Sequence, residues 1–291
     1  MKPAPFAYVG PRSIAEALEA LARYGSDARA LAGGQSLVPL MNLRMARPAA
    51  LIDLGRVSEL AYIRRDGDWL AIGAMTRQAD AEHSALVSEV CPLVARALPY
   101  LGHPAIRHRG TIGGTLAHAD RVAELTAVAV ALDAELVAAG PTGRRTIPAR
   151  AFFVGDLSNS LAPGELLVEA RFPIAPASAR SAFVEAANRH HDLAIVGVAC
   201  QIDVGPEERI RGARIAIHGA GPTPIRLSGA EAALIGTPAS GEQFAQAAQV
   251  TRLALDDVTP EDDMYASASY RRHVTPGLVE RALSLCMSRA T

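Results

Sequence analysis

The sequence has few cysteines and few aromatic residues. Its three cysteines, Cys91, Cys200 and Cys286, are far apart, and no Cys-x-x-Cys pair occurs. Iron–sulfur clusters and structural zinc sites use closely spaced cysteine ligands, so we expect neither in this chain. Each cysteine is expected to be a small buried apolar residue. Phe, Tyr and Trp make up only 4% of the residues, which argues against an aromatic platform for single-stranded nucleic acid.

No charge of one sign predominates, and no apolar run is long enough to cross a membrane. Lysine and arginine number 29 and aspartate and glutamate 30, which gives a net charge of -1. This balance offers no electrostatic footprint for nucleic acid or for an anionic membrane surface. The most apolar stretch, residues 122–139, is interrupted by Glu124, Asp133 and Glu135. The N-terminus also lacks the apolar segment of a signal peptide, so we expect a soluble cytoplasmic protein.

Residues that usually carry catalysis show no recognisable pattern. Neither His-x-x-x-His nor His-Glu-x-x-His occurs among the eight histidines, which argues against a metal site. Ser36 has no evident His/Asp partner, so a hydrolase is not supported. Arg271-Arg272-His273 is expected to lie on a solvated helix face, with a basic patch for a partner subunit as the alternative.

Two small units are predicted in the first 175 residues. Ser13 and Glu16 form a capping box for a helix that Gly25 ends. The rest of the first unit is predicted to comprise a strand at 28–31, a glycine pair, a helix at 37–45 and a strand at 51–54. The second unit is predicted to comprise a hairpin of 62–65 with 69–72, helices at 85–100 and 123–132, two strands around 140–143 and a strand at 166–172.

A different pattern follows Pro173 and Pro176, which indicate a linker. Three consecutive strands are predicted at 181–187, 195–203 and 210–219, and helices are predicted to begin near Gly241, Ser267 and Pro276. Strands followed by helices are typical of a separate α+β domain.

Two glycine pairs are the most informative local feature. The first lies in Ala32-Gly-Gly-Gln-Ser36 and the second in Gly110-Thr-Ile-Gly-Gly-Thr115. Glycine lets another group approach the backbone closely, so free N–H groups in the two loops could hold the two phosphates of one dinucleotide. Neither segment matches the Rossmann or P-loop pattern. The residues alone therefore leave a dinucleotide clasp and two ordinary turns both open.

Longer segments around these pairs resemble a known family. Residues 32–44 read AGGQSLVPLMNLR and residues 107–120 read RHRGTIGGTLAHAD. They are similar to the two FAD-binding segments of the medium subunit of molybdenum hydroxylases, the carbon monoxide dehydrogenase and xanthine dehydrogenase family. The likeness extends to residues 161–167, 189–194 and 270–273, and so covers nearly the whole chain.

The resemblance implies an α+β fold in two domains. Residues 1–175 would form a two-subdomain FAD-binding fold of the vanillyl-alcohol oxidase/PCMH type, with subdomains of about 1–55 and 56–175. Residues 178–291 would form a C-terminal α+β domain of a three-stranded antiparallel sheet and a helical bundle.

The resemblance also implies the cofactor contacts. The glycine loops would cradle the pyrophosphate, Glu124 would bind FAD hydroxyls, and Leu101 and Leu167 would pack beside the flavin or the adenine. The full set of expected FAD contacts is Arg29, Ala32, Gly33, Gly34, Gln35, Ser36, Leu37, Leu101, Thr111, Gly113, Gly114, Thr115, Ala117, His118, Asp120, Glu124, Leu161, Leu167 and Leu193. No side chain is expected to be catalytic, and none to bind a metal.

Four positions in or next to these segments depart from the family pattern. Thr115 replaces Asn or Ser, Arg121 replaces a proline, Leu193 replaces an aromatic residue, and Gln35 replaces the histidine usual in carbon monoxide dehydrogenases. Thr115 keeps a hydroxyl, whereas Arg121 brings a cation to its loop and Leu193 removes a stacking side chain near the flavin.

The function implied is electron transfer within a complex. A large subunit would carry the molybdenum cofactor and a small subunit two [2Fe–2S] clusters, in a dimer of heterotrimers. FAD in this chain would pass electrons to an external acceptor such as NAD, a quinone, a cytochrome or O2. A stand-alone FAD oxidoreductase and a non-enzymatic FAD-binding assembly module are the alternatives. The hydroxylated substrate is not encoded in this chain.

Overall fold

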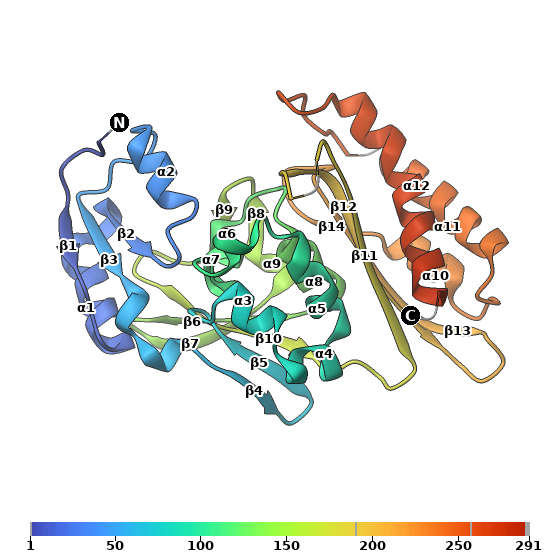
Figure 1. The fold of residues 1–291 in the computed structure, drawn as a ribbon, viewed down its shortest axis with the longest axis horizontal. Coiled ribbons are helices and arrows are strands. Elements are labelled where there is room, and N and C mark those ends of the chain that lie inside the picture. The colour runs from blue at the N-terminus through green and yellow to red at the C-terminus, as the bar shows by residue number, and fades with distance from the viewer. Residues whose placement is uncertain (1, 190, 257, 289–291) are drawn as a thin grey trace.

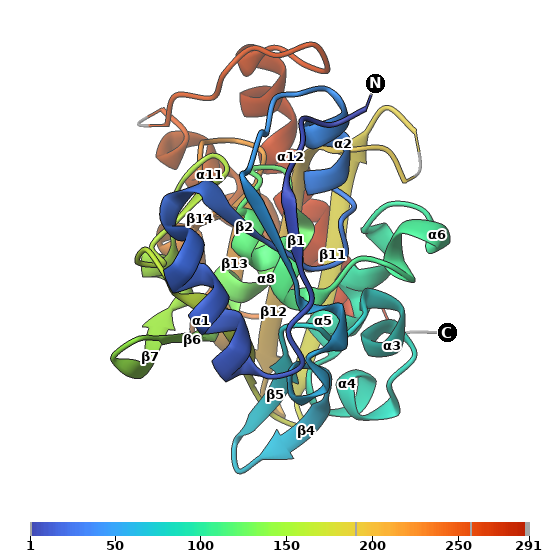
Figure 2. The same ribbon diagram turned by 90° about the vertical axis from the view of Figure 1, so that its left-hand side faces the viewer.

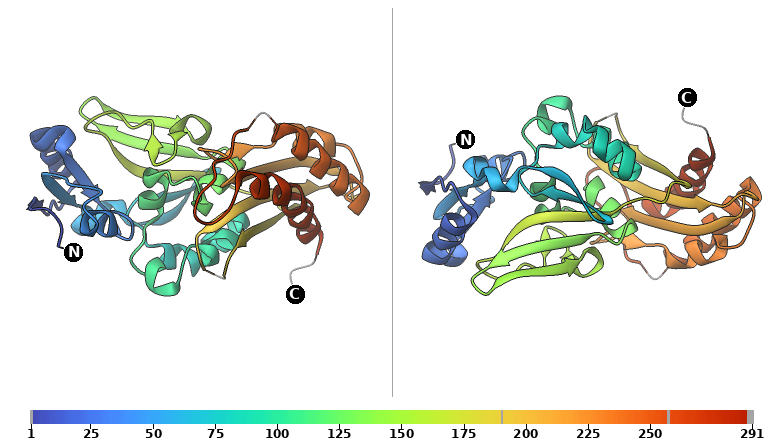
Figure 3. Two further views of the ribbon diagram at one scale, coloured as in Figure 1. Left: turned by 90° about the horizontal axis from the view of Figure 1, so that it is seen from above. Right: turned by 90° about the horizontal axis from the view of Figure 1, so that it is seen from below.

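The computed structural model describes residues 2–189, 191–256 and 258–288; His190, within one of the family-like segments, lies outside them. Three units follow one another along the long axis, each built on its own sheet (Figures 1 and 3). They are called the N-terminal unit (2–55), the central unit (56–175) and the C-terminal unit (178–288).

The N-terminal unit is a small parallel sheet with the strand order β1-β3-β2 (Figure 2). Its elements are β1 (Ala7–Val9), α1 (Ile14–Tyr24), β2 (Ala28–Leu31), α2 (Leu37–Asn42) and β3 (Ala50–Asp53). As predicted, the Ser13 hydroxyl accepts the Glu16 N–H and Gly25 ends α1. The capping box is only half formed, because the Glu16 carboxylate accepts the Arg12 N–H rather than that of Ser13. β1 was not predicted, and α2 ends three residues earlier than expected.

The central unit is a five-stranded antiparallel sheet with helices on one face. The strand order β4-β5-β10-β6-β7 comprises β4 (Ile63–Asp66), β5 (Trp69–Gly73), β10 (Leu166–Pro173), β6 (Glu135–Gly140) and β7 (Gly143–Pro148). Its helices and remaining strands are α3 (Gln78–Glu82), α4 (Ala85–Val90), α5 (Pro92–Ala97), α6 (Pro104–Arg107), α7 (Ile112–His118), α8 (Glu124–Ala131), α9 (Ala149–Phe152), β8 (Phe153–Gly155) and β9 (Ser158–Asn159). Three short 3-10 turns accompany them: η2 (Leu54–Arg56), η3 (Ser58–Leu60) and η4 (Leu98–Tyr100). A further 3-10 turn, η1 (Gly25–Asp27), follows α1 in the N-terminal unit.

One helix prediction and one loop prediction in this unit were wrong in detail. The helix expected at 85–100 is divided at Cys91, because Pro92 has no N–H to continue the hydrogen-bond ladder and instead begins α5. The second glycine pair is not a loop before a helix: Gly113 and Gly114 lie inside α7.

The C-terminal unit is an antiparallel sheet between two layers of helices (Figure 1). Its elements are β11 (Ala179–Ala187), β12 (Ala194–Val204), β13 (Ile210–His218), β14 (Ile225–Arg226), α10 (Ser228–Leu234), α11 (Gly241–Ala254) and α12 (Ala268–Met287). One face packs on α10 and α12, which α11 covers in turn, and the other face contacts α5 and α8 of the central unit. The fourth strand and α10 were not predicted, and Pro276 lies within α12 rather than at a helix start.

The segment predicted to be a linker is fixed to the central unit. Ile174 donates its N–H to the Asp68 carbonyl at 2.9 Å, and Ala175 to the Val90 carbonyl at 2.8 Å. All three cysteines are free and buried, as expected. Among the helices that the structure describes, none is both long and apolar enough to cross a membrane.

Arg271 corrects another expectation, because it is buried rather than on a solvated face. Only 1% of the residue is exposed. Its guanidinium donates to the carbonyls of Ile195 and Gly219 and forms an ion pair with Asp263. This one side chain therefore ties α12 to the ends of β12 and β13.

We expect Arg271→Met to lower the free energy of unfolding by about 3–5 kcal/mol, because the buried Ile195 and Gly219 carbonyls lose their charged donor and Asp263 keeps only Arg121 as a cationic partner. Arg252→Met, at an exposed position of α11, is the matched control and should change stability by no more than about 0.5 kcal/mol. Urea unfolding measures both. Equal midpoints for the two variants would contradict a structural role for Arg271.

Candidate functional site

The first glycine loop connects β2 to α2 and presents unpaired backbone donors. The N–H groups of Gly33, Gly34, Gln35 and Ser36 have no hydrogen-bond partner within the described residues. Gly34 has a φ of +75°, which glycine adopts without strain, and the Gln35 side-chain amide donates to the Gly33 carbonyl at 3.2 Å. Four consecutive free N–H groups next to the first turn of a helix favour an anionic group.

The second glycine pair does not offer such donors, contrary to the sequence-based expectation. The Gly113 N–H donates to the Ala74 carbonyl at 2.9 Å, and the Gly114 N–H to the Thr111 hydroxyl at 3.0 Å. The Thr115 N–H donates to the Thr111 carbonyl at 3.1 Å. Thr111 is thus the N-cap of α7, and these three N–H groups are satisfied within the chain.

Close packing explains why glycine occupies these positions. A Cβ on Gly113 would lie 2.4 Å from the Ala74 Cβ, and a Cβ on Gly33 would lie 2.3 Å from the Arg109 carbonyl oxygen. A Cβ on Gly114 would lie 2.6 Å from the Thr111 Oγ1 and 3.2 Å from the Ala32 Cβ. The two glycine segments therefore lie directly against each other, and the second one positions the first.

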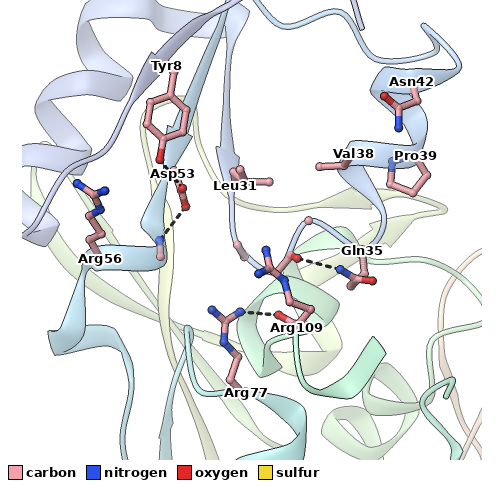
Figure 4. Close-up of a pocket in the computed structure, with 14 residues that line it drawn as sticks. Tyr8, Leu31, Gln35, Val38, Pro39, Asn42, Asp53, Arg56, Arg77 and Arg109 are labelled. Carbon is pink, nitrogen blue, oxygen red and sulfur yellow. Dashed lines mark hydrogen bonds between the residues drawn. The ribbon is translucent and has the colours of Figure 1, made fainter. Parts of the chain in front are cut away.

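A cavity of about 560 Å³ opens beside the first loop (Figure 4). Ala32, Gly33, Gly34 and Gln35 are the predicted residues that line it. Three arginines that were not singled out from the sequence also line it: Arg56, Arg77 and Arg109.

The three arginines give this cavity a positive charge. None of them forms an ion pair with a carboxylate among the described residues. Arg77 donates instead to the Arg109 backbone carbonyl. The cavity's Asp53 is already held by the Tyr8 hydroxyl at 2.6 Å and the Gly55 N–H at 2.9 Å. Because Arg56 lies in η2, Arg77 between β5 and α3, and Arg109 between α6 and α7, the sequence could not show that they meet.

The other predicted contacts extend away from this cavity through the central unit. Leu101 and Leu167 belong to the central core, and Leu161 and Ala117 pack against that core. Leu193 is 54% exposed, on the approach to β12. Three further predicted residues are Arg29, Leu37 and His118. The Arg29 guanidinium donates to the Ser26 and Ala28 carbonyls, Leu37 is the first residue of α2, and His118 is the last of α7.

Two carboxylates follow α7. Asp120 accepts the Val122 N–H at 3.0 Å, and Glu124 begins α8 and is buried. Burial is the main cause that raises the pKa of Glu124 to about 7, and the Asp120 charge contributes to the same shift. A buried carboxylate without a cationic partner is suited to accept hydrogen bonds from ligand hydroxyls.

Arg121, where the family has a proline, joins the central unit to the C-terminal unit. Its guanidinium pairs with Glu261 and Asp263, each at 2.9 Å. Its carbonyl accepts the Gly219 N–H at 2.8 Å. The cation therefore fixes the loop between α7 and α8 against the loop before α12, and it does not point to a ligand.

Two family models and several known proteins match nearly the whole chain. Residues 4–175 match the model of the FAD binding domain in molybdopterin dehydrogenase, and residues 181–285 that of the CO dehydrogenase flavoprotein C-terminal domain. The chain is 43% identical to the 6-hydroxypseudooxynicotine dehydrogenase complex subunit alpha of Paenarthrobacter nicotinovorans, over 100% of this chain and 97% of the relative. It is 36% identical to the carbon monoxide dehydrogenase medium chain of Hydrogenophaga pseudoflava, over 99% of each.

Two solved structures have the same fold as this chain over nearly its whole length. Carbon monoxide dehydrogenase from Hydrogenophaga pseudoflava superimposes with a TM-score of 0.95 at 37% identity, over 100% of both chains. Quinoline 2-oxidoreductase from Pseudomonas putida 86 superimposes with a TM-score of 0.92 at 33% identity, over 98% of this chain and 97% of the other.

Proposed function

The chain belongs to the family of FAD-binding medium subunits of molybdenum hydroxylases, and from this premise we propose which of its residues hold the cofactor. It is an FAD-carrying electron-transfer subunit of an oxidoreductase complex. When bound, FAD supplies the redox chemistry, while the protein supplies binding, orientation and electrostatics.

The observation that carries the assignment is the first glycine loop with its cavity. A diphosphate carries negative charge and many acceptor oxygens. The four unpaired N–H groups at Gly33 to Ser36 are donors of the right kind, and the cavity contributes the cationic side chains of Arg56, Arg77 and Arg109. The residues present therefore fit the pyrophosphate of FAD.

The other predicted residues take supporting or contacting roles in this proposal. Thr111, Gly113, Gly114 and Thr115 hold α7 against the first loop and so fix its position. Asp120 and Glu124 accept hydrogen bonds from cofactor hydroxyls, and apolar contacts come from Leu101, Leu161, Leu167 and Leu193. Residues 1–175 would act as the FAD domain, with subdomains of about 1–55 and 56–175, and residues 178–291 as the C-terminal domain.

The partners follow from the family. Relatives are parts of carbon monoxide, nicotine and caffeine dehydrogenases or hydroxylases. We propose a large molybdenum-cofactor subunit and a small [2Fe–2S] subunit in a dimer of heterotrimers, in the cytoplasm. NAD, a quinone, a cytochrome or O2 would accept the electrons.

The purified protein is expected to be yellow, with one FAD per chain and little affinity for FMN. FMN has no pyrophosphate, so it cannot satisfy both the N–H groups of the first loop and the cavity's arginines. Extracting the flavin and comparing it with FAD and FMN standards checks this. Bound FMN, or equal affinity for the two flavins, would refute the pyrophosphate cradle.

A further inference from the structure

A row of three residues crosses the C-terminal sheet where it meets the central unit. Glu185 of β11 pairs with Gly197 of β12, and Gly197 pairs with His218 of β13. Directly paired residues point to the same face of an antiparallel sheet. Since Gly197 has no side chain, the His218 ring fills its place: a Cβ on Gly197 would lie 2.1 Å from the His218 Nε2.

The imidazole leans across β12 toward the strand that carries Glu185. The His218 ring stacks on Phe183 of β11, with centroids 5.9 Å apart and planes 11° apart. Phe183 lies two residues before Glu185 on the same strand, and its side chain belongs to the core shared with the central unit. The row therefore faces the central unit and not the helices α10 to α12.

Helix α8 brings a second carboxylate to this seam. Glu124 starts α8, and α8 packs on both β12 and β13. The Glu124 charge raises the pKa of Glu185. Neither carboxylate has an ion-pair partner among the described residues.

Three buried polar atoms of this cluster lack hydrogen-bond partners within the described part of the chain. They are the Glu185 Oε2 and both ring nitrogens of His218. Unsatisfied buried polar atoms are costly and rare, so three of them in one place call for a functional explanation. Clusters of titratable groups at such sites are typical of functional positions.

The pKa values follow from the same geometry. Burial, together with a smaller contribution from the Glu124 charge, raises the pKa of Glu185 to about 8. Burial also lowers the pKa of His218 to about 3, so the imidazole is neutral. Among the described residues, Tyr100 of η4 also lies at this face, with its ring centroid 5.0 Å from that of Phe183. Burial and the Glu185 charge raise the pKa of Tyr100, and Arg281 of α12 lowers it.

We propose that Glu124, Glu185 and His218 form a proton-holding site beside the FAD site, and that its carboxylates take up a proton when electrons reach the subunit. This inference rests on the proposed function, because Glu124 is the residue that links the row to the cofactor. Added negative charge on a nearby group favours the neutral form of a carboxyl.

The proton balance is simple. One carboxylate oxygen gains H⁺ from solvent and becomes a carboxylic acid, while the electrons stay on the cofactor. Oxidation by the external acceptor reverses both changes. His218 stays neutral in both states, because burial lowers its pKa to about 3, so the proton is held on a carboxylate.

The test is the pH dependence of the flavin midpoint potential in the FAD-loaded protein, between about pH 6 and 9. Glu185→Gln keeps the shape of the side chain and removes its titration. We expect the wild type to take up more protons per two electrons than Glu185→Gln, by up to about one near pH 8. Glu207→Gln, at a side chain 85% exposed on the β12–β13 hairpin, is the control and should match the wild type.

A second measurement uses the protein without FAD. The folded pKa values of Glu124 and Glu185 lie above their unfolded values, so their stabilising effect is present at low pH and lost as pH rises through about 7 to 8. His218 has the opposite sign, since its folded pKa is lowered and its contribution is lost as pH falls below about 6.5. Glu185→Gln should therefore remove part of the stability loss on the alkaline side, measured by urea unfolding.

The outcomes separate this inference from the proposed function. If the wild type and Glu185→Gln both bind FAD and show the same proton uptake, the proton-holding site is refuted and the FAD assignment stands. If the wild type binds no FAD, the proposed function fails. Unfolding profiles with identical pH dependence would then refute the proton-holding site as well, and a flatter profile for Glu185→Gln would support it.

Discussion

Gly34→Val is expected to abolish FAD binding and to leave the C-terminal unit folded. At the Gly34 φ of +75° a β-branched residue is strained, and its Cβ would lie 3.2 Å from Val38 Cγ2 and 3.4 Å from Leu31 Cδ1. The loop must move to relieve this strain, so its unpaired N–H groups no longer point toward the same phosphate group. The flavin content of the purified variant, read from its visible absorbance, gives the result.

The chain offers a matched control for the backbone effect. Gly236, in the C-terminal unit, has a φ of +82° and nothing within 4 Å of an added Cβ. Gly236→Val therefore carries similar backbone strain far from the loop and should keep its FAD. Gly114→Val should lose FAD by another route, since its side chain would press on Thr111 and Ala32 and separate α7 from the loop. Stoichiometric flavin in both Gly34→Val and Gly114→Val would show that the cradle is wrongly assigned.

Elements with strong local signals could be predicted from the sequence. The Ser13 cap, the Asp66-Gly67-Asp68 turn and the three consecutive strands of the C-terminal sheet all lie close to where their patterns place them. β1 could not be predicted, because three residues are too few for a periodic pattern and its pairing partner β3 lies far along the chain. Pro276 was misleading, since proline is common at helix starts, yet packing on β12 keeps α12 continuous through it.

The candidate site was predictable in its segments but not in its contacts. The sequence identified both glycine pairs, yet only the fold shows that the Ala74 carbonyl and the Thr111 hydroxyl occupy the donors of the second pair. The burial of Arg271 likewise depends on two carbonyls at strand ends far from it in sequence. Such roles are set by tertiary neighbours, and no local pattern encodes them.

The isolated subunit, mixed anaerobically with the substrate of its complex, is expected to keep its FAD oxidised. The reason is the division of redox centres between chains. Cys91 lies in the core of the central unit, whereas Cys200 and Cys286 lie together in the core of the C-terminal unit, with their Sγ atoms 3.8 Å apart. Cluster ligands must converge on one exposed or loop-lined site, so these three thiols cannot hold an iron–sulfur cluster, and electrons must arrive from a partner.

The reconstituted complex should lose its flavin absorbance under the same conditions. A chemical reductant added to the isolated subunit is the control, because it shows that the bound flavin can be reduced when electrons are supplied. The contrast between the two samples depends on the partner alone, since the FAD and its cradle are the same in both. Rapid reduction of the isolated subunit by substrate would overturn the electron-transfer role and favour a stand-alone oxidoreductase. A complex that binds substrate without reducing this flavin would instead leave the chain as an FAD-binding assembly module.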